Sequence, residues 1–392
     1  MTWGMALMWL IASALLMRWS FKNARDVLLL RMIRTTSDSF PGTVAAFETP
    51  PTTSKPSQSP TTDFDVVAYY NDLVQEDPTI TPPIAAIQAL ISLLAKTQLT
   101  TISETLSLLA THSQKLLASQ RNPIPLSAGT ELFQRYLVSS FQQRPSSLAD
   151  SDFTTLRHHI LTNSSLFVKR ANEARLKIAH YALPFIKEES TIITYGYSRV
   201  VQTLLTHAAE SGRYFNVIYI LPSAGFTDNI SQSISKLRKL SIPTTTIPLS
   251  AMTYALASLP ATSSAPQLIV GASAVLENGS VVTELGTHQI GMISKAVSMP
   301  LHIAVESYKF VRNFPLGFGP LDLARMGVKQ DVLHFSTNTG SQAKEQSTSE
   351  SQLVDVRDMV EITPPELIDA LITENGILTP KAVSEELIKL WF

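Results

Sequence analysis

The sequence of 392 residues contains no cysteine. This absence excludes disulfide bonds, thiolate metal ligands and a cysteine nucleophile. A G-x-S-x-G nucleophile elbow is also missing, although the spacing of residues alone leaves a Ser/His/Asp triad open. The eight histidines include the adjacent pair His158 and His159, which face different sides of a helix, and no His/Asp/Glu cluster has the spacing of a zinc site. We therefore predict neither a metal centre nor a cofactor.

An excess of charge of one sign is missing as well. The chain carries 31 Lys and Arg against 32 Asp and Glu, which gives a net charge of −1, and no long run of one sign occurs. Proteins that bind nucleic acid usually show a clustered basic surface. The composition therefore predicts no direct contact with nucleic acid.

The first 62 residues differ from the rest. Met5 to Met17 form an apolar run that is too short to cross a bilayer comfortably, which takes about 20 residues. The run fits a signal or transit peptide only in part. We expect an upstream extension, such as one from a misplaced start codon; a membrane or secreted protein is the alternative that this run would support. Residues 49–62 consist almost entirely of Pro, Ser and Thr and predict a disordered linker.

Residues 63–182 show the apolar spacing of helices, which predicts an N-terminal helical domain. Thr81 is a plausible N-cap with Pro82 in the first turn, and Thr101 with Glu104 forms a possible capping box.

From residue 183 to 392 short apolar runs alternate with helical stretches, one of which opens at Thr227 or Asp228. This alternation predicts an α/β fold with a doubly wound parallel sheet, in which ligands bind beyond the carboxyl ends of the strands. A polar insertion is expected near residues 336–352. The expected strands cover residues 191–195, 215–221, 244–249, 267–272 and 301–306.

The junction "TYGYSRVV" places Tyr197, Ser198 and Arg199 at the start of a helix. Free backbone N–H groups at a helix N-terminus favour an anion, to which Ser198 and Arg199 could add a hydroxyl and a charge. The other interpretation is that Ser198 is an N-cap and Arg199 a solvated residue, and this stretch alone favours it. Glu277 and Glu306, which end or follow strands, are either structural residues or general bases.

Several segments together resemble the alpha subunits of the initiation factor 2B alpha/beta/delta family. The resemblance covers about residues 63–392 and is carried by "SAGTELFQRYL", "TYGYSRVV", "VGASAVLENGSVVTELGTHQIGMISKA", "VESYKFVRNFPL" and "NGILTPKAVSEELIKLWF". It implies a helical domain, a Rossmann-like domain and a homodimer formed through the latter.

The resemblance also implies a cytosolic, non-catalytic regulatory subunit of the exchange complex for translation initiation factor 2. Its expected partners are a second copy of itself, the beta, gamma, delta and epsilon subunits, and phosphorylated initiation factor 2. The alternative is a sugar-phosphate isomerase, because the family shares its fold with such enzymes.

Those isomerases use a cysteine and an aspartate to move protons. Alignment through the shared motifs puts the cysteine position near Gly196 and the aspartate position on Ser273, and neither residue acts as an acid or base near neutral pH. Thr283 and Glu284 stand where the isomerases carry Asn and Lys, and Gln88 stands where the family has an arginine.

The stretch "QLIVGASAVLENGSVVTELGT" (267–287) thus keeps the backbone of a phosphate loop without its catalytic groups. We expect at most a relic pocket that binds an anion, for which the resemblance implies a sugar phosphate; its candidate residues are Thr194, Tyr197, Ser198, Arg199, Ser273 and Thr283.

Overall fold

The computed structural model describes residues 64–142, 165–333 and 356–391, apart from positions 78, 98, 100, 224, 260–264, 331 and 357. The extension and linker expected over residues 1–62, the pair His158 and His159, and the polar insertion at 336–352 lie outside this part. None of the helices that the structure describes combines the length and the apolar character needed to cross a bilayer.

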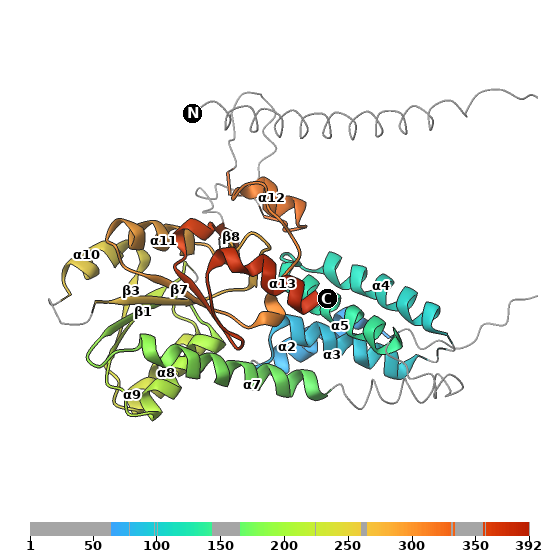
Figure 1. Ribbon diagram of the computed structural model, residues 1–392, viewed down its shortest axis with the longest axis horizontal. Coiled ribbons are helices and arrows are strands. Elements are labelled where there is room, and N and C mark those ends of the chain that lie inside the picture. Colours follow the sequence, from blue (N-terminus) through green and yellow to red (C-terminus); the bar gives the residue numbers. More distant parts are fainter. Residues whose placement is uncertain are drawn as a thin grey trace, which may run out of the picture. The chain divides into compact units, whose positions relative to one another are not determined.

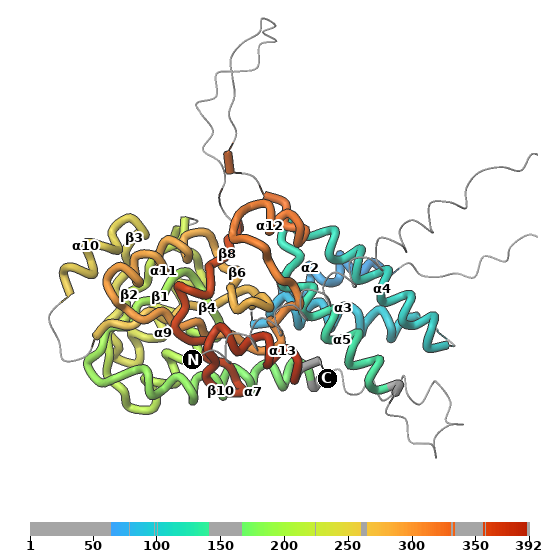
Figure 2. Tube along the Cα trace, turned by 45° about the horizontal axis from the view of Figure 1, so that its top comes forward, coloured from blue at the N-terminus to red at the C-terminus, as the bar shows by residue number. Residues whose placement is uncertain are grey.

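Four of the helices that the structure describes form the N-terminal part, drawn in blue to teal in Figures 1 and 2. Its central helix is α3, whose apolar residues are buried on nearly every side. Thr81 is the residue that precedes α3, as predicted, and Thr101 and Glu104 form the predicted capping box of α4. The four helices are α2 (Val66–Glu76), α3 (Pro82–Lys96), α4 (Ile102–Ser119) and α5 (Ile124–Gln142).

A glycine sets the distance between α3 and α5. A Cβ atom placed on Gly129 would lie 2.3 Å from the carbonyl oxygen of Pro83, a separation that no real side chain tolerates. The start of α3 and the first turns of α5 can therefore approach closely, which brings both helices to the edge of the site described below.

The second part is built on a seven-stranded sheet with the strand order β10-β9-β7-β4-β1-β2-β3. All neighbours are parallel except the terminal hairpin of β9 and β10. This order confirms the predicted α/β class with a doubly wound sheet. From β1 the chain adds β2 and β3 on one side and then β4, β7 and β9 on the other, so the strand order reverses between β1 and β4. The strands are β1 (Thr191–Tyr195), β2 (Asn216–Leu221), β3 (Thr244–Pro248), β4 (Gln267–Gly271), β7 (Leu301–Ala304), β9 (Ala370–Thr373) and β10 (Gly376–Leu378).

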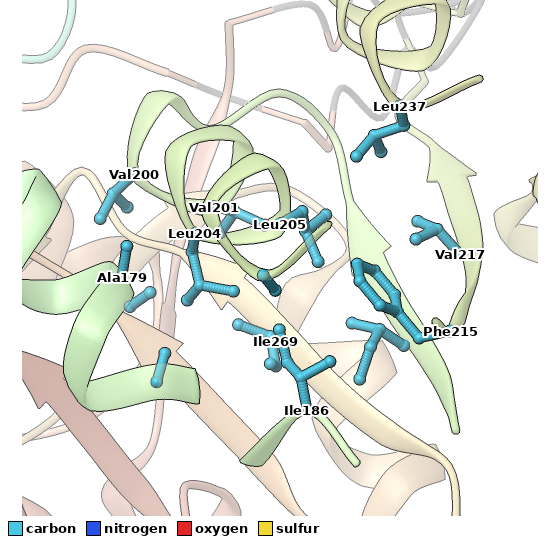
Figure 3. Packing of buried hydrophobic residues seen from close by; sticks show 14 of the residues in the cluster. Ala179, Ile186, Val200, Val201, Leu204, Leu205, Phe215, Val217, Leu237 and Ile269 are labelled. Atoms are coloured by element: carbon cyan, nitrogen blue, oxygen red, sulfur yellow. The ribbon is translucent and has the colours of Figure 1, made fainter. Parts of the chain in front are cut away.

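Helices cover both faces of this sheet. Successive residues of a strand point to opposite faces, so Ile192 of β1 packs in one core and Ile193 in the other. Figure 3 shows the first core, in which Val201, Leu204 and Leu205 of α8 lie over Phe215 and Ile269. This core is shared by α7 (Ser165–Ala182), α8 (Arg199–Glu210) and α9 (Asp228–Lys239); the second is shared by α10 (Met252–Ala257), α11 (Thr287–Ala296) and α13 (Val383–Trp391).

Helix α7 packs in two cores, the first core of the large sheet and a separate core among the N-terminal helices. Its residue Ala171 packs with the N-terminal helices, whereas Ile178 and Ala179 pack against the sheet. The helical pattern over residues 63–182 is therefore present where the structure describes it, but the last helix of that range also covers the sheet.

A second, three-stranded antiparallel sheet has the order β5-β6-β8 and was not expected from the sequence. Its strands β5 (Ala274–Val275), β6 (Val281–Glu284) and β8 (Val360–Thr363) contain only two to four residues each. Such short runs show little alternation of apolar and polar residues, which is the sequence signal of a strand. Residues 267–287 thus form a strand of the large sheet followed by a hairpin of the small one.

Candidate functional site

A cavity of about 480 Å³ opens at the carboxyl ends of β1 and β4, the two strands between which the strand order of the large sheet reverses. Its walls include residues that follow β1, from Tyr197 to Arg199, and residues that follow β4, from Ala272 to Ser273. This is the position at which open α/β sheets bind ligands, beyond the carboxyl ends of the strands. The volume falls in the range of small-molecule sites, about 300–1,000 Å³.

Ser198 and Arg199 begin helix α8 on one wall. Ser198 is the N-cap, and its Oγ accepts a hydrogen bond from the Val201 amide at 3.5 Å. Arg199 lines the cavity and is half-buried rather than fully solvated. Burial lowers the pKa of Arg199, and the nearby Arg175 lowers it further, whereas Tyr197 and Glu306 oppose the change. Ser198 is therefore the N-cap that one interpretation of the sequence predicted, while Arg199 lines the cavity, as the anion-site interpretation predicted.

The absence of a side chain at Gly271 leaves room for the side chain of Ser198. A Cβ atom at position 271 would lie 2.2 Å from the Ser198 Oγ and 2.6 Å from its Cβ. A side chain on β4 would therefore push Ser198 away from the start of α8. The last residue of this strand has to be glycine for the observed geometry.

The first turns of other helices line the same cavity. Thr81 and Pro82 come from the start of α3, Pro125 from α5, Asn229 from α9 and Thr287 from α11. The N-terminus of a helix carries a partial positive charge, which favours an anion; Pro82 and Pro83, the first two residues of α3, have no N–H group, so α3 adds only this charge. The sequence had indicated that helices start at Thr81 and Thr227, but it did not indicate that both helix starts line the same cavity.

The amides at the start of α11 already have an acceptor. Oε1 of Glu361, a residue of β8, accepts hydrogen bonds from the backbone N–H groups of Gly286 and His288, both at 2.7 Å. Gly286 has a φ of +115°, which favours glycine, and a Cβ there would meet the Tyr195 ring. The predicted phosphate loop therefore contributes side chains to the cavity, while a carboxylate of the chain itself binds its helix N-terminus.

Two acidic side chains, Glu284 and Asp358, also line the cavity. Glu284 ends β6 and lies beside Gly196, where an added Cβ would be 2.5 Å from the Glu284 Oε2. Although Glu284 is exposed to the open cavity, its carboxyl is partly shielded from water by the cavity walls. This desolvation raises the pKa of Glu284, and the carboxylate of Asp358 raises it further. Glu284 thus occupies the space beside the position at which the related isomerases would carry their cysteine.

A buried ion-pair network lies behind Lys309, the second basic residue of the cavity wall. The Lys309 ammonium donates to the Ala272 carbonyl at 3.1 Å and lies 2.8 Å from Oε2 of Glu306. The other oxygen of Glu306 accepts from Nε of Arg175 at 3.2 Å and from the Tyr308 hydroxyl at 3.0 Å.

The network determines what Glu306 can do. Glu306 is 0 % exposed, and this burial alone would raise the pKa of its carboxyl. Lys309 and Arg175 outweigh the effect and hold the pKa at about 2. Glu306 is thus a structural anion rather than a general base near neutral pH. Glu277, the other carboxylate considered from the sequence, is not among the residues of the cavity wall.

The six candidate residues of the relic pocket can now be placed. Tyr197, Ser198, Arg199, Ser273 and Thr283 line the cavity. Thr194 does not; it is buried within β1, one residue before the end of the strand. Neither Lys309 nor Asp358 was predicted as a site residue, because both reach the cavity from distant segments. Gln88 lies in α3 away from the cavity wall.

The walls offer groups that can bind a ligand, but positions 196 and 273 do not carry the pair of acid–base side chains that the isomerases use. Gly196 has no side chain, and Ser273 ends in a hydroxyl that does not ionise near neutral pH. Among the residues that the structure describes, no three His, Asp or Glu side chains lie close enough together to hold a metal ion.

Comparison with known proteins agrees with this architecture. The model of the initiation factor 2 subunit family matches residues 75–380, which is most of the chain. The chain belongs to the initiation factor 2 subunit family. Within this family it is 30% identical to the translation initiation factor eIF2B subunit alpha of Dictyostelium discoideum over 335 residues, which cover 84% of this chain and 98% of that protein. The eIF2B subunit alpha of Caenorhabditis elegans is 25% identical and covers 83% of the chain and 98% of its own length.

Solved structures of family members share the fold. The crystal structure of eIF2B beta from Chaetomium thermophilum superposes with a TM-score of 0.63 at 16% identity and covers 83% of this chain and 92% of its own. A chain of the tetrameric eIF2B-beta2-delta2 complex from C. thermophilum gives a TM-score of 0.61 at 17% identity, covering 83% of this chain and 95% of that one. The helical part followed by the doubly wound sheet is thus the architecture of the family.

Proposed function

We propose that this chain is a non-catalytic, alpha-type regulatory subunit of the cytosolic complex that exchanges guanine nucleotide on translation initiation factor 2. The observation that carries the proposal is the 30% identity to an eIF2B subunit alpha over 98% of that protein's length. A match over nearly the whole relative includes both parts of the fold and not only the sheet.

The geometry of the cavity supports a non-catalytic role. The isomerases of this fold need a cysteine and an aspartate, and Gly196 and Ser273 stand at those positions. Glu284 lies within 2.5 Å of the place that a Cβ at position 196 would take, so a cysteine side chain would not fit there without movement of that carboxylate.

The proposal includes a homodimer, formed through the sheet domain, that bridges beta, gamma, delta and epsilon subunits. Two related chains of the same fold form the tetrameric beta2-delta2 complex of C. thermophilum, which supports assembly between chains of this architecture. We place the contact with a second copy on an apolar patch of the loop before α12 (Pro320–Arg325) and of α12 itself. Phe314, Leu316 and Leu321 of this patch are 63, 82 and 75% exposed, which is unusual for apolar side chains that have no partner.

We further propose that the helical part contributes to sensing phosphorylated initiation factor 2. A phosphorylated side chain is best recognised by basic side chains. Arg170 of α7 is an exposed cation on this part, and so is Lys115 of α4, whose ammonium lies 3.8 Å from Oδ1 of the exposed Asp65. Charge reversal at both positions should weaken the response to the phosphorylated factor and leave the oligomeric state unchanged. An unchanged response would count against this surface.

The proposal is tested by affinity purification of the tagged full-length chain, followed by identification of its partners and assays for sugar-phosphate isomerisation. We expect the four other subunits to co-purify and no turnover of ribose 1,5-bisphosphate or methylthioribose 1-phosphate. A chain that purifies without these partners, or that isomerises either compound, would overturn the proposal.

A further inference from the structure

Two helices that cover the large sheet, α9 and α11, end in the same type of turn. After α9, the Ser241 amide donates to the Arg238 carbonyl at 3.0 Å, and the Ile242 amide donates to the Leu237 carbonyl at 3.1 Å. This pair of bonds defines a Schellman motif, and Leu237 and Ile242 also pack in the same core. Ser241 has a φ of +62°, in the left-handed region that is usually occupied by glycine at this position.

The turn after α11 has the same geometry. The Ser298 amide donates to the Lys295 carbonyl at 3.2 Å, the Met299 amide donates to the Ser294 carbonyl at 2.9 Å, and Ser298 has a φ of +55°. Both turn serines are exposed, and each is followed by a buried apolar residue and a proline. A serine in this conformation is therefore not in itself a sign of function, and the two turns can be compared directly.

The two turns differ in the charges that precede the serine. The last turn of α9 carries three exposed cations, Lys236, Arg238 and Lys239, whereas that of α11 carries Lys295 alone. The helix macrodipole favours cations at any helix C-terminus, so it explains one or two of them but not the difference between the helices. Among the described residues, none forms an ion pair with the three cations of α9 or a hydrogen bond with the Ser241 hydroxyl.

The turn at Ser241 also lies at an edge of the fold. The strand that follows it, β3, is the last one on its side of the large sheet, whereas β7, which follows Ser298, lies between β4 and β9. Ile242 is buried, so the turn has to open locally before the serine can enter the active site of another protein. A helix end beside an edge strand opens more easily than the middle of a sheet, and Pro243 favours an extended backbone at Ile242.

We propose that Ser241 is a phosphorylation site for a protein kinase with an acidic substrate groove. Such a kinase selects a serine by the cations before it, here Arg238 and Lys239 at three and two positions before the acceptor. The Ser241 hydroxyl oxygen bonds to the γ-phosphorus of ATP, the bond from this phosphorus to the departing ADP oxygen breaks, and the hydroxyl proton passes to a base of the kinase. This modification is independent of the assembly role.

The phosphate would change how the turn is held. The guanidinium of Arg238 reaches past Ser241 and donates to the carbonyl of Thr244, the first residue of β3, at 3.0 Å. A phosphate on Ser241 is a stronger acceptor for this guanidinium than a carbonyl group is, because it is charged. Arg238 would therefore turn to the phosphate and release the start of the edge strand.

Treatment of the purified full-length chain with ATP and the catalytic subunit of protein kinase A, followed by mapping of the phosphate by mass spectrometry, tests the proposal. We expect Ser241 to be phosphorylated at least about tenfold faster than Ser298, the lower end of what a hydrogen bond to a charged group contributes. Equal rates at the two serines, or no phosphate on Ser241, would overturn the proposal.

Matched variants connect the reaction to the cations. Arg238→Gln should slow phosphorylation of Ser241 by at least about tenfold, and Lys381→Gln, which removes an exposed cation elsewhere, should not. Ser241→Gly should abolish it and still fold, because glycine adopts a positive φ without strain. A rate that Arg238→Gln leaves unchanged would contradict selection by charge.

Hydrogen exchange compares the phosphorylated and the unmodified chain. Amides of β3 (Thr244–Pro248) should exchange faster after phosphorylation, and amides of β7 (Leu301–Ala304) should not change. The same exchange of β3 in both forms would contradict the release of the edge strand.

Discussion

The buried carboxylate of Glu306 gives the strongest test of the energetics. Its two oxygens contact Arg175 Nε at 3.2 Å, the Tyr308 hydroxyl at 3.0 Å and Lys309 Nζ at 2.8 Å, and the side chain is 0 % exposed. Glu306→Gln removes the charge and leaves two buried cations without a counterion. Loss of one partner of a buried ion pair typically costs about 3–5 kcal/mol.

The depressed pKa of Glu306 corresponds to a stabilisation of the same order, because the same ion pairs cause it. Its value falls from 4.5 to about 2 in the folded chain, and at 1.36 kcal/mol for each pKa unit this corresponds to roughly 3 kcal/mol. Because the folded pKa is depressed, this stabilisation is fully present above the unfolded pKa and is lost as the pH falls towards the folded pKa. The contribution should decrease by more than half between neutral pH and about pH 3.

Urea unfolding of the wild type and of Glu306→Gln, at a fixed protein concentration and several pH values, measures this contribution. We expect the variant to be less stable by about 3 kcal/mol at pH 7, with a difference that shrinks as the pH falls. Glu385→Gln, which removes an exposed carboxylate, is the control. A variant as stable as the wild type at pH 7, or a difference that does not depend on pH, would refute the reasoning.

Three further changes test other parts of the account. Glu361→Ala leaves the Gly286 and His288 amides without their acceptor and should lower the free energy of unfolding by about 1–2 kcal/mol; an effect no larger than that of the exposed Glu366→Ala would contradict it. Gly271→Ala places a Cβ against Ser198 and should lower the free energy of unfolding by about 1–3 kcal/mol, whereas Gly319→Ala, where the space is open, should leave it unchanged. The double variant Leu316→Asp/Leu321→Asp should shift the chain from dimer to monomer in analytical ultracentrifugation. The monomer should remain folded in urea unfolding, and a dimer that stays intact would show that the contact lies elsewhere.

Local patterns in the sequence predicted five of the seven strands of the large sheet and missed the terminal hairpin of β9 and β10. Apolar runs bounded by polar residues marked β1, β2, β3, β4 and β7, and the structure moves their ends by at most two residues. The largest difference is at β7, which ends at Ala304 instead of Glu306 because the chain turns into a short 3-10 segment at Ser307–Lys309. Helix starts at Thr81, Thr101, Ser198 and Thr227 were also visible, since capping depends on neighbours in the sequence.

Features that depend on distant residues were not predictable in this way. Arg175 and Glu306 are 131 positions apart, and neither lies in a motif that indicates a partner. Asp358 reaches the cavity from a segment beyond the expected polar insertion, and its φ of 63°, which is uncommon outside glycine, is not marked by any pattern in the sequence. The sequence identified Glu284 as a departure from the isomerases, but its position beside Gly196 became visible only when β1 and β6 were placed in space.

Nucleotide exchange on initiation factor 2 by the reconstituted complex tests the central claim most directly. GDP release is measured with and without this chain, and with unphosphorylated or phosphorylated factor. The account predicts that exchange continues without the chain, whereas inhibition by the phosphorylated factor becomes weaker. Complete loss of exchange without the chain, or inhibition of the same strength, would contradict a non-catalytic regulatory role.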